Sequence, residues 1–385
     1  MEKCLFVFGT RPEAIKMAPL VEELNKGGEV KVCVTAQHRQ MLDQVLKTFR
    51  IVPDFDLNVM QAGQELSDLT SRLITEISKV LKSYRPNVIF VQGDTTTCLA
   101  GSLAAFYEKI PVAHVEAGLR SFNLQAPWPE EMNRRMATTL SRWHFAPTER
   151  AKRNLLEEKV PEDRICVTGN TVIDALQWAV SRPLSFDNGR LRKLFNSRTL
   201  PLSRSRLILV TAHRRENFGR PLKNICSALK AVADAFGDVQ MVYPVHLNPN
   251  VQSAARKILA AHPRIHLLPP LNYLDFSRLM EKSHLVVTDS GGLQEEAPSL
   301  GKPVLVLREV TERPEAVRAK TAKVIGTEKN RIIREVSKLL EDTRLYRQMA
   351  SARNPYGDGR AAQRICQALG YFFGYARRPK DFLPR

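Results

Sequence analysis

Short apolar segments alternate with amphipathic helical segments along most of the chain, and this alternation is the feature that most constrains its fold. In the first half the predicted strands are Leu5–Phe8, Val30–Thr35, Val88–Val91, Val112–Val115 and Arg164–Val167. Between them, segments such as Glu13–Leu24 and Leu66–Ser83 have helical periodicity. Continuously apolar strands rich in β-branched residues are typical of a parallel sheet that helices cover on both faces.

The same pattern begins again after Ser181–Arg206, a stretch with Pro, Ser and Arg that we interpret as the inter-domain region. The second series of predicted strands is Arg206–Thr211, Val239–Val245, Ile265–Leu268, Leu285–Thr288 and Val304–Leu307, with helices such as Leu222–Ala235 between them. A length of 385 residues also favours two domains or more. We therefore predict an α/β protein of two doubly wound domains with a ligand in the cleft between them.

The amino-acid composition limits which classes of partner and which cellular compartment are expected. Lys and Arg number 58 against 40 Asp and Glu, but they are scattered and lack the interleaved aromatics of a nucleic-acid module. We predict a mostly solvated basic surface and no nucleic-acid partner, with weak association with anions as the alternative. The tail Arg377–Arg385 is predicted to be disordered.

No apolar run reaches the roughly eighteen residues of a membrane span, and the apolar N-terminal stretch is too short for a signal peptide. The six cysteines form no CxxC pair and no metal-ligand spacing, which fits a reducing compartment. We predict a cytoplasmic protein with no stable membrane insertion and no metal site.

Two turns combine the end of a predicted strand with the start of a predicted helix. They are Phe8-Gly9-Thr10-Arg11-Pro12-Glu13 and Asp289-Ser290-Gly291-Gly292. A helix N-terminus attracts anions because its amides lack intrahelical partners and the helix dipole favours negative charge. The glycines of the second turn allow a diphosphate to approach the backbone, although an ordinary Gly-rich turn is the alternative interpretation.

Three residues near these turns are candidate ligand contacts. Arg11 presents a guanidinium for phosphate, and Lys16, one helical turn further on, is a second cation unless it is simply solvated. Glu296 lies one turn into the second helix, where its carboxylate can accept hydrogen bonds from ribose hydroxyls.

Acidic residues and a histidine follow other predicted strands, where ligands of open α/β sheets bind. The candidates are Asp94, Glu116, Glu130 and His213. Asp94 has an alternative as a helix N-cap, and Glu130 has one as a carboxylate favoured by the helix dipole. His114 is interpreted as a core histidine. Carboxylates beside a phosphate would weaken a plain receptor, so acid–base catalysis is favoured, with elimination or transfer at the anomeric carbon of a nucleotide sugar.

These residues belong to motifs that closely resemble those of the bacterial non-hydrolysing UDP-N-acetylglucosamine 2-epimerases. The motifs span residues 8 to 359: Phe8–Met17 (FGTRPEAIKM), Gln37–Gln44 (QHRQMLDQ), Gln92–Thr97 (QGDTTT), His114–Arg120 (HVEAGLR), Pro127–Arg134 (PWPEEMNR), His213–Asn217 (HRREN), Thr288–Gly301 (TDSGGLQEEAPSLG) and Asn354–Gly359 (NPYGDG). The resemblance implies two Rossmann-like domains of the glycosyltransferase-B type. They would comprise residues 1–170 with a C-terminal helix at about 362–385, and residues 171–361.

The resemblance also implies the reaction, a reversible inversion at C2 that converts UDP-GlcNAc to UDP-ManNAc, a precursor for surface polysaccharide. In this family UDP leaves by anti elimination to give 2-acetamidoglucal and then adds back, with no nicotinamide or metal, and a homodimer is expected. Asp94, Glu116, Glu130 and His213 match the catalytic set. The positions matching UDP contacts are Arg11, Lys16, Phe276, Ser290, Gly291, Gly292, Glu296 and Arg313.

Many bacterial relatives bind a second UDP-GlcNAc as an activator, and Gln37, Gln40, Arg214 and His246 match that site. Two departures keep alternatives open: Gly63 replaces an arginine of several relatives, and residues 315–321 (EAVRAKT) differ from the usual EGVEAGT-like pattern. The alternatives are a hydrolysing relative that releases ManNAc and UDP, an epimerase of a modified UDP-diacetamido sugar, a glycosyltransferase of the same architecture, and a non-catalytic nucleotide-sugar sensor.

Overall fold

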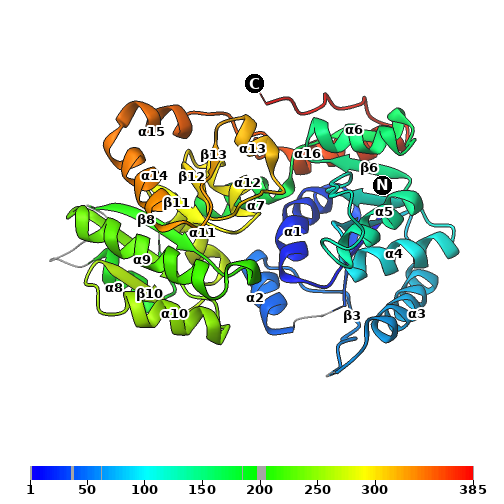
Figure 1. Ribbon diagram of the computed structural model, residues 1–385. Helices are drawn as coiled ribbons and strands as arrows, with labels where there is room; N and C mark the ends of the chain where they lie inside the picture. The colour runs from blue at the N-terminus through cyan, green and yellow to red at the C-terminus, as the bar shows by residue number, and fades with distance from the viewer. Residues whose placement is uncertain (1, 36–38, 62, 184, 197–204, 385) are drawn as a thin grey trace. The chain divides into compact units, whose positions relative to one another are not determined.

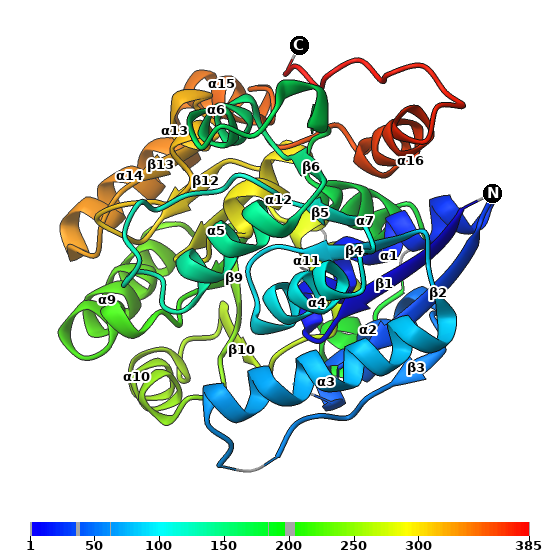
Figure 2. The same ribbon diagram turned by 90° about the vertical axis from the view of Figure 1, so that its right-hand side faces the viewer.

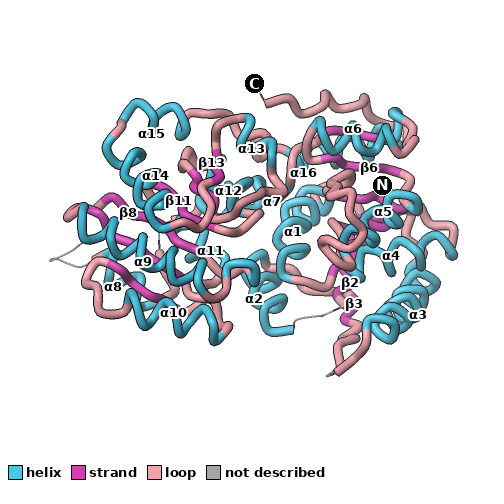
Figure 3. Tube along the Cα trace, in the orientation of Figure 1, coloured by secondary structure: helices cyan, strands magenta, loops and turns pink. Residues whose placement is uncertain are grey.

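The chain folds into two compact α/β units (Figures 1 and 3). The computed structural model describes residues 2–35, 39–61, 63–183, 185–196 and 205–384. Unit 1 runs from the N-terminus to Ala175 and includes Tyr356–Pro384, and unit 2 is Leu176–Pro355. Each unit contains one parallel sheet with helices, which confirms the predicted α/β class with two doubly wound sheets.

The sheet of unit 1 has seven parallel strands in the order β3-β2-β1-β4-β5-β6-β7. Its strands are β1 (Lys3–Phe8), β2 (Glu29–Val34), β3 (Phe55–Asp56), β4 (Val88–Gln92), β5 (Val112–Val115), β6 (Trp143–Ala146) and β7 (Ile165–Val167). The sequence prediction missed β3 and β6. β3 is only two residues long, and His144 interrupts the apolar run of β6.

The helices of unit 1 are α1 (Arg11–Asn25), α2 (Arg39–Phe49), α3 (Leu66–Tyr84), α4 (Thr96–Tyr107), α5 (Glu130–Leu140), α6 (Glu149–Glu157), α7 (Thr171–Val180, which runs on into unit 2) and α16 (Ala361–Phe372). The C-terminal helix α16 packs against α1, and its Phe372 ring stacks on Trp143 of β6 with centroids 5.1 Å apart. The last helix of the chain therefore completes the first unit.

The tail after α16, red in Figure 2, is docked on strand β7, which lies at an edge of the sheet. The amide of Phe382 donates to the carbonyl of Val167 at 2.7 Å, and the amide of Val167 donates to Oδ1 of Asp381 at 3.1 Å. Arg378 Nη2 donates to the carbonyl of Ile165 at 2.7 Å, and the Phe382 side chain is buried. The predicted disorder is wrong for residues 377–384, because this segment carries an apolar anchor and satisfies backbone groups of an edge strand.

The sheet of unit 2 has six parallel strands in the order β10-β9-β8-β11-β12-β13. Its strands are β8 (Arg206–Thr211), β9 (Val239–Pro244), β10 (Ile265–Leu268), β11 (Leu285–Thr288), β12 (Val304–Val306) and β13 (Ala322–Val324). The helices are α8 (Gly189–Phe195), α9 (Arg220–Ala235), α10 (Pro249–Leu259), α11 (Tyr273–Lys282), α12 (Leu293–Ser299), α13 (Pro314–Arg318), α14 (Lys329–Glu341) and α15 (Thr343–Ala350). The three-residue strand β13 was not predicted.

The stretch interpreted as the inter-domain region contains α8 and lies inside unit 2. Buried Asp275 of α11 accepts hydrogen bonds from the amides of Asp187 and Asn188 at 2.9 and 2.8 Å. A carboxylate that ties a loop to a helix in this way is not visible in composition. Across both units, none of the described helices has the length and apolar character needed to cross a membrane.

Candidate active site

The first turn after β1 is built around a glycine that cannot be replaced without a clash. A Cβ at Gly9 would lie 2.0 Å from Oγ1 of Thr35 and 2.8 Å from Oγ1 of Thr97. These two hydroxyls are themselves hydrogen-bonded at 2.9 Å. The turn therefore packs directly on the ends of the neighbouring β2 and the start of α4.

Glu13 holds this turn, and its role was missed in the sequence. Its Oε2 accepts hydrogen bonds from the amides of Gly9 and Thr10 at 3.0 and 2.7 Å, and its Oε1 accepts one from Thr95 Oγ1 at 2.6 Å. Complete burial raises the pKa of Glu13. These two amides are thus occupied by the chain's own carboxyl group, and anion binding at this helix N-terminus stays a prediction. Arg11, at the first position of α1, is the candidate phosphate contact that this turn retains.

Lys16 and Glu116 form a buried ion pair at the carboxyl end of β5. Lys16 Nζ lies 2.8 Å from Oε1 and 2.6 Å from Oε2 of Glu116. Asn170, in the loop after β7, donates to Oε2 from Nδ2 at 2.8 Å. Glu116 has a left-handed backbone with φ of 65°, which a non-glycine residue adopts only where its surroundings hold it there. The lysine is therefore not a solvated helix residue, and two other segments, α1 and the loop after β7, hold this carboxylate.

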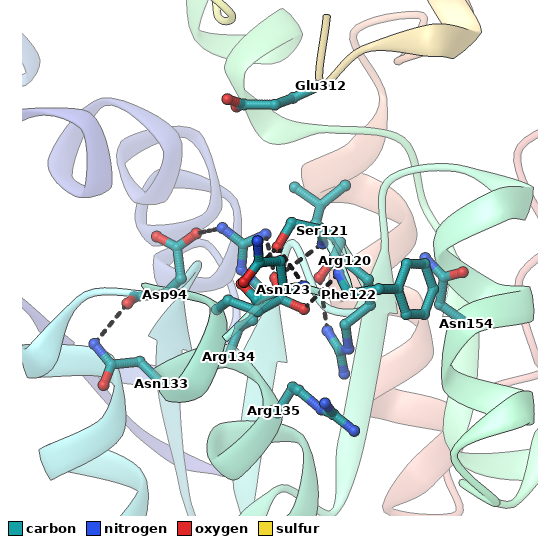
Figure 4. Close-up of polar contacts among 12 residues, drawn as sticks. Asp94, Arg120, Ser121, Phe122, Asn123, Asn133, Arg134, Arg135, Asn154 and Glu312 are labelled. Atoms are coloured by element: carbon teal, nitrogen blue, oxygen red, sulfur yellow. Dashed lines mark hydrogen bonds and ion pairs between the residues drawn. The ribbon is translucent and has the colours of Figure 1, made fainter. Parts of the chain in front are cut away.

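Asp94 follows β4, the neighbour of β5 in the sheet, and is held by α5 (Figure 4). Its carboxylate forms an ion pair with Arg134, and its carbonyl accepts a hydrogen bond from Asn133 Nδ2 at 3.0 Å. The N-cap of α4 is Thr95, whose Oγ1 accepts from the amide of Cys98 at 3.1 Å. The alternative in which Asp94 caps this helix is therefore wrong, and its carboxylate is available for chemistry.

Glu130 and Glu131 are adjacent in sequence but have different roles. Glu131 holds a loop, and Glu130 is the candidate catalytic residue. Buried Glu131 accepts from the amides of Ser121 and Phe122 at 2.9 and 3.1 Å and lies 3.3 Å from Arg134 Nη1 (Figure 4 shows this loop). Glu130 is half-buried at the start of α5 and makes no hydrogen bond with a described residue. The loop contacts belong to Glu131, whereas the position of Glu130 suits both catalysis and the helix dipole.

In unit 2, Asp289 organises the segment that carries His213. Its Oδ2 accepts from the amides of His213 and Arg214 at 2.7 and 2.8 Å and from Asn217 Nδ2 at 3.0 Å. Its Oδ1 lies 3.5 Å from Nδ1 of His213. Burial lowers the pKa of His213; Asp289 opposes this effect, and His246 and Arg214 add to it. His213 therefore favours its neutral form.

The second glycine turn lies beside this histidine segment. The Ser290 amide donates to Thr288 Oγ1 at 2.9 Å, whereas the amides of Gly291 and Gly292 donate to no described acceptor. A Cβ at Gly291 would lie 3.7 Å from Arg214 Nη2, and one at Gly292 would lie 3.3 Å from Glu296 Oε1. Ser290, Gly291, Gly292 and Glu296 are thus brought together.

Arg313 contacts the same helix, α12, through Glu295, a residue that the sequence analysis did not single out. It forms an ion pair with buried Glu295, and Thr311 Oγ1 donates to Gln294 Oε1 at 2.5 Å. Phe276 lies half-buried on α11, and no hydrogen bond, ion pair or ring contact joins it to the other predicted residues of the described chain.

The residues matched to an activator site are only partly described. Gln37 lies outside the described residues, and the Gln40 side chain does as well, although its backbone belongs to α2. The His246 ring stacks on that of His213 with centroids 5.4 Å apart. The structure thus brings together Lys16 and Glu116 in unit 1. In unit 2 it brings together His213 and His246, Arg214 and Gly291, and Gly292 and Glu296. The location of the site in a cleft between the units stays a prediction.

Comparison with known proteins decides the family. The family model described as UDP-N-acetylglucosamine 2-epimerase matches residues 22–370. The chain belongs to this epimerase family. The UDP-N-acetylglucosamine 2-epimerase of Escherichia coli (strain K12) is 55% identical over 369 residues, which cover 95% of this chain and 98% of that protein.

Solved structures of the epimerase family match the fold over nearly the whole chain. The UDP-GlcNAc 2-epimerase from Neisseria meningitidis, bound to UDP-GlcNAc, has 50% identity and a TM-score of 0.86, with 95% of this chain and 99% of that chain covered. The S. aureus MnaA–UDP co-structure has 48% identity and a TM-score of 0.87, with 100% of each chain covered. The two-domain fold is therefore glycosyltransferase-B-like, and the chain is a UDP-GlcNAc 2-epimerase.

Several residues that support the epimerase clusters were missed in the sequence. They are Glu13, Asn170, Arg134, Asp289 and Glu295, which hold Gly9, Glu116, Asp94, His213 and Arg313 respectively. Four of the five lie inside quoted motifs. The Thr10-x-x-Glu13 spacing of a capping box could have predicted the contacts of Glu13, but nothing in the sequence says which groups Arg134, Asp289 and Glu295 contact. Asn170 had no signal at all.

Proposed function

We propose that this epimerase works without net hydrolysis and interconverts UDP-GlcNAc and UDP-ManNAc by elimination and re-addition of UDP. The observation that carries the proposal is the pair of carboxylates at adjacent strand ends: Asp94 after β4 is held by Arg134, and Glu116 after β5 is held by Lys16 and Asn170. A Neisseria meningitidis relative bound to UDP-GlcNAc supports the same substrate here.

In the proposed reaction a base removes the proton at C2 of the sugar, and the C2–H electron pair forms the C1=C2 double bond. The C1–O bond breaks with both electrons going to the oxygen of UDP, which leaves 2-acetamidoglucal. UDP then adds back at C1 while C2 is reprotonated on its other face. Every electron pair returns to its starting bond type, so the route is redox-neutral and needs no redox cofactor. We propose that it also proceeds without a metal.

The proposed residues form two groups: those that move the proton at C2 and those that stabilise the negative charge of the departing UDP. Asp94, Glu116 and Glu130 are the candidates for moving the C2 proton, because general acid–base catalysis needs a carboxyl group placed by its neighbours. Neutral His213 is the fourth proposed catalytic residue. Contacts to UDP are assigned to Arg11, Lys16, Phe276, Ser290, Gly291, Gly292, Glu296 and Arg313. Cations and backbone amides stabilise diphosphate as its negative charge grows.

We also infer the setting of this activity from the family resemblance. A second UDP-GlcNAc is the proposed activator, held by Gln37, Gln40, Arg214 and His246. The stacking of His246 on His213 supports a direct link between such a site and a catalytic residue. A cytoplasmic homodimer that supplies ManNAc-type precursors for surface polysaccharide completes the proposal.

The test is to incubate the protein with UDP-GlcNAc in deuterated water and follow the sugar by NMR. We expect deuterium at C2 and formation of UDP-ManNAc. In Glu116→Gln we expect exchange to fall by about a thousandfold or more, since an acid–base group typically contributes 10²–10⁴-fold, while UDP binding changes little.

Glu157→Gln is the matched control, because Glu157 is exposed on α6 and makes no ion pair with a described residue; it should retain full exchange. Free UDP in equal amount with ManNAc would contradict the non-hydrolysing proposal and support the hydrolysing alternative. Loss of UDP binding in folded Glu116→Gln would instead assign Glu116 to nucleotide binding.

A further inference from the structure

A second cluster of cations lies in unit 1, outside the residues assigned to the epimerase reaction. A cavity of about 400 Å³ is lined by α16 on one wall and by the C-terminal tail on the other. Its cationic side chains are Arg360, Arg364, Arg377, Arg378 and Lys380. We call this cavity the basic groove.

The α16 wall of the basic groove is set by the packing of the helix. Ala361, Ile365 and Ala368 are buried on one face. Arg364 and Gln367 lie on another face and line the groove, since side chains three and four residues apart share a helix face.

The tail wall is fixed as well. Phe382 is buried with its amide on Val167, and the Arg364 guanidinium lies 5.3 Å from the centre of the Phe382 ring. Gln367 Nε2 donates to the carbonyl of Arg377 at 3.1 Å and so connects the two walls. The groove is therefore assembled before any ligand binds, which reduces the entropy cost of binding.

The positive charge of the groove is only partly balanced. Asp358 pairs with Arg364 through two contacts of 2.7 Å, and the nearby Asp381 faces Lys152 at 3.3 Å. Arg360, Arg377 and Lys380 make no ion pair with any residue in the described ranges. Cations gathered in a concave site repel one another and attract anions, more strongly at low salt.

We propose that the basic groove binds a compact anion that carries several phosphate charges, such as a di- or triphosphate. Guanidinium groups match phosphate oxygens with paired hydrogen bonds, and the volume falls in the range of small-molecule sites, about 300–1,000 Å³. The described lining residues include no aromatic side chain for base stacking and no large apolar side chain for a membrane. These features favour a small phosphorylated ligand over a nucleic acid or a lipid surface.

The experiment is a calorimetric titration of inorganic triphosphate into the full-length protein in the presence of saturating UDP, which occupies the proposed nucleotide site. We expect saturable binding that weakens as salt is added. The triple variant Arg360→Ser/Arg377→Ser/Lys380→Ser should weaken it by about tenfold or more, because charge-assisted contacts are lost. Triphosphate should also slow hydrogen exchange of the amides in residues 376–382.

The control triple Lys257→Ser/Arg344→Ser/Arg347→Ser removes the same charge from exposed positions of unit 2. It should change the affinity by less than about twofold, since none of the three residues lines the groove and exposed charges are screened by salt. Equal weakening in the two triple variants would overturn the proposal, as would absence of saturable binding. Binding of anionic phosphatidylglycerol vesicles without binding of triphosphate would also overturn it. UDP affinity, measured separately, tests the epimerase proposal and is independent of these outcomes.

Discussion

His213 illustrates how neighbouring groups set the protonation of a single residue. Burial disfavours its charged form, and the stacked His246 and nearby Arg214 act in the same direction, while Asp289 opposes them. A catalytic group is most useful when its dominant form at working pH is the one that the reaction needs. The two histidines therefore connect a proposed activator residue to a proposed catalytic residue through electrostatics.

This connection can be measured in His246→Gln. Removal of the neighbouring imidazole takes away a group that disfavours protonation and exposes His213 to water, so the pKa of His213 should rise. The pH titration of the His213 ring signals by NMR provides the measurement. An unchanged or lower pKa in the variant would show that His246 does not act on His213.

The close approach of Thr35 Oγ1 to the Cβ position of Gly9 gives a second prediction about a single residue. Gly9→Ala should lower the free energy of unfolding by about 1–3 kcal/mol, because its Cβ would overlap Thr35 Oγ1 and force the turn to shift. Urea unfolding followed by circular dichroism measures the loss. Gly27→Ala is the control, since nothing lies within 4 Å of a Cβ there; a similar loss in both variants would contradict the steric explanation.

At the scale of residues, sequence reasoning located groups by strand end but could not assign their partners. Asp94 and Glu116 follow neighbouring strands of one sheet, and His213 follows β8 of the other. These strands were predicted within a residue or two, so the position of each group at the carboxyl end of a strand could be inferred. The contacts of Asp289 could not, because its carboxylate binds the amides of His213 and Arg214, which only the folded chain brings near. Glu13 is different: it binds amides three and four residues earlier, in a capping box with Thr10 that the sequence analysis overlooked. The same limit explains why Asp94 was given an N-cap alternative that Thr95 fills instead.

Elements with a strong apolar pattern were predictable, and short or interrupted ones were not. All ten predicted strands are present, but β3, β6 and β13 were missed because they are short or contain a polar residue. The tail was judged by its charged residues alone. Its folded position depends on Phe382 and Asp381. Both contact Val167 of β7, which lies more than two hundred residues earlier in the sequence.

The docking of the tail can be tested with Phe382→Ala. Truncation of this buried ring should lower the free energy of unfolding by about 2–4 kcal/mol, from lost burial and the cavity left behind. Hydrogen exchange of the Val167 amide, which donates to Asp381, should become faster. Leu383→Ala is the matched control, because Leu383 is 57% exposed and should change stability little. Unchanged exchange at Val167 in Phe382→Ala would mean that Phe382 does not hold the tail in place.

At the scale of the whole molecule, two buried histidines predict how stability depends on pH. His114 and His144 face each other on β5 and β6, and burial lowers their pKa values to about 4 and about 3. In the unfolded chain a histidine binds a proton below about pH 6.5. The unfolded state therefore takes up more protons between these values, and stability is complete above about pH 6.5 and falls as the pH decreases toward 4.

We expect urea unfolding to show a loss on the order of 1–2 kcal/mol per buried histidine between about pH 7 and pH 5. In His114→Gln, which can keep the hydrogen bond to the Gly93 carbonyl, this dependence should be smaller. Gly27→Ala is the control, because it leaves every histidine in place and nothing lies within 4 Å of a Cβ there, so the dependence should be unchanged. An equal pH dependence in wild type and His114→Gln would remove His114 as its source.

The contacts of the tail with β7 also bear on the behaviour of many copies of the chain together. They satisfy the Val167 amide and carbonyl and the Ile165 carbonyl, the outward backbone groups of a strand with a sheet neighbour on one side only. An uncovered edge of this kind is a template for strand pairing between molecules. A chain that ended before Arg378 would expose these groups. The last few residues therefore oppose aggregation by covering the edge strand.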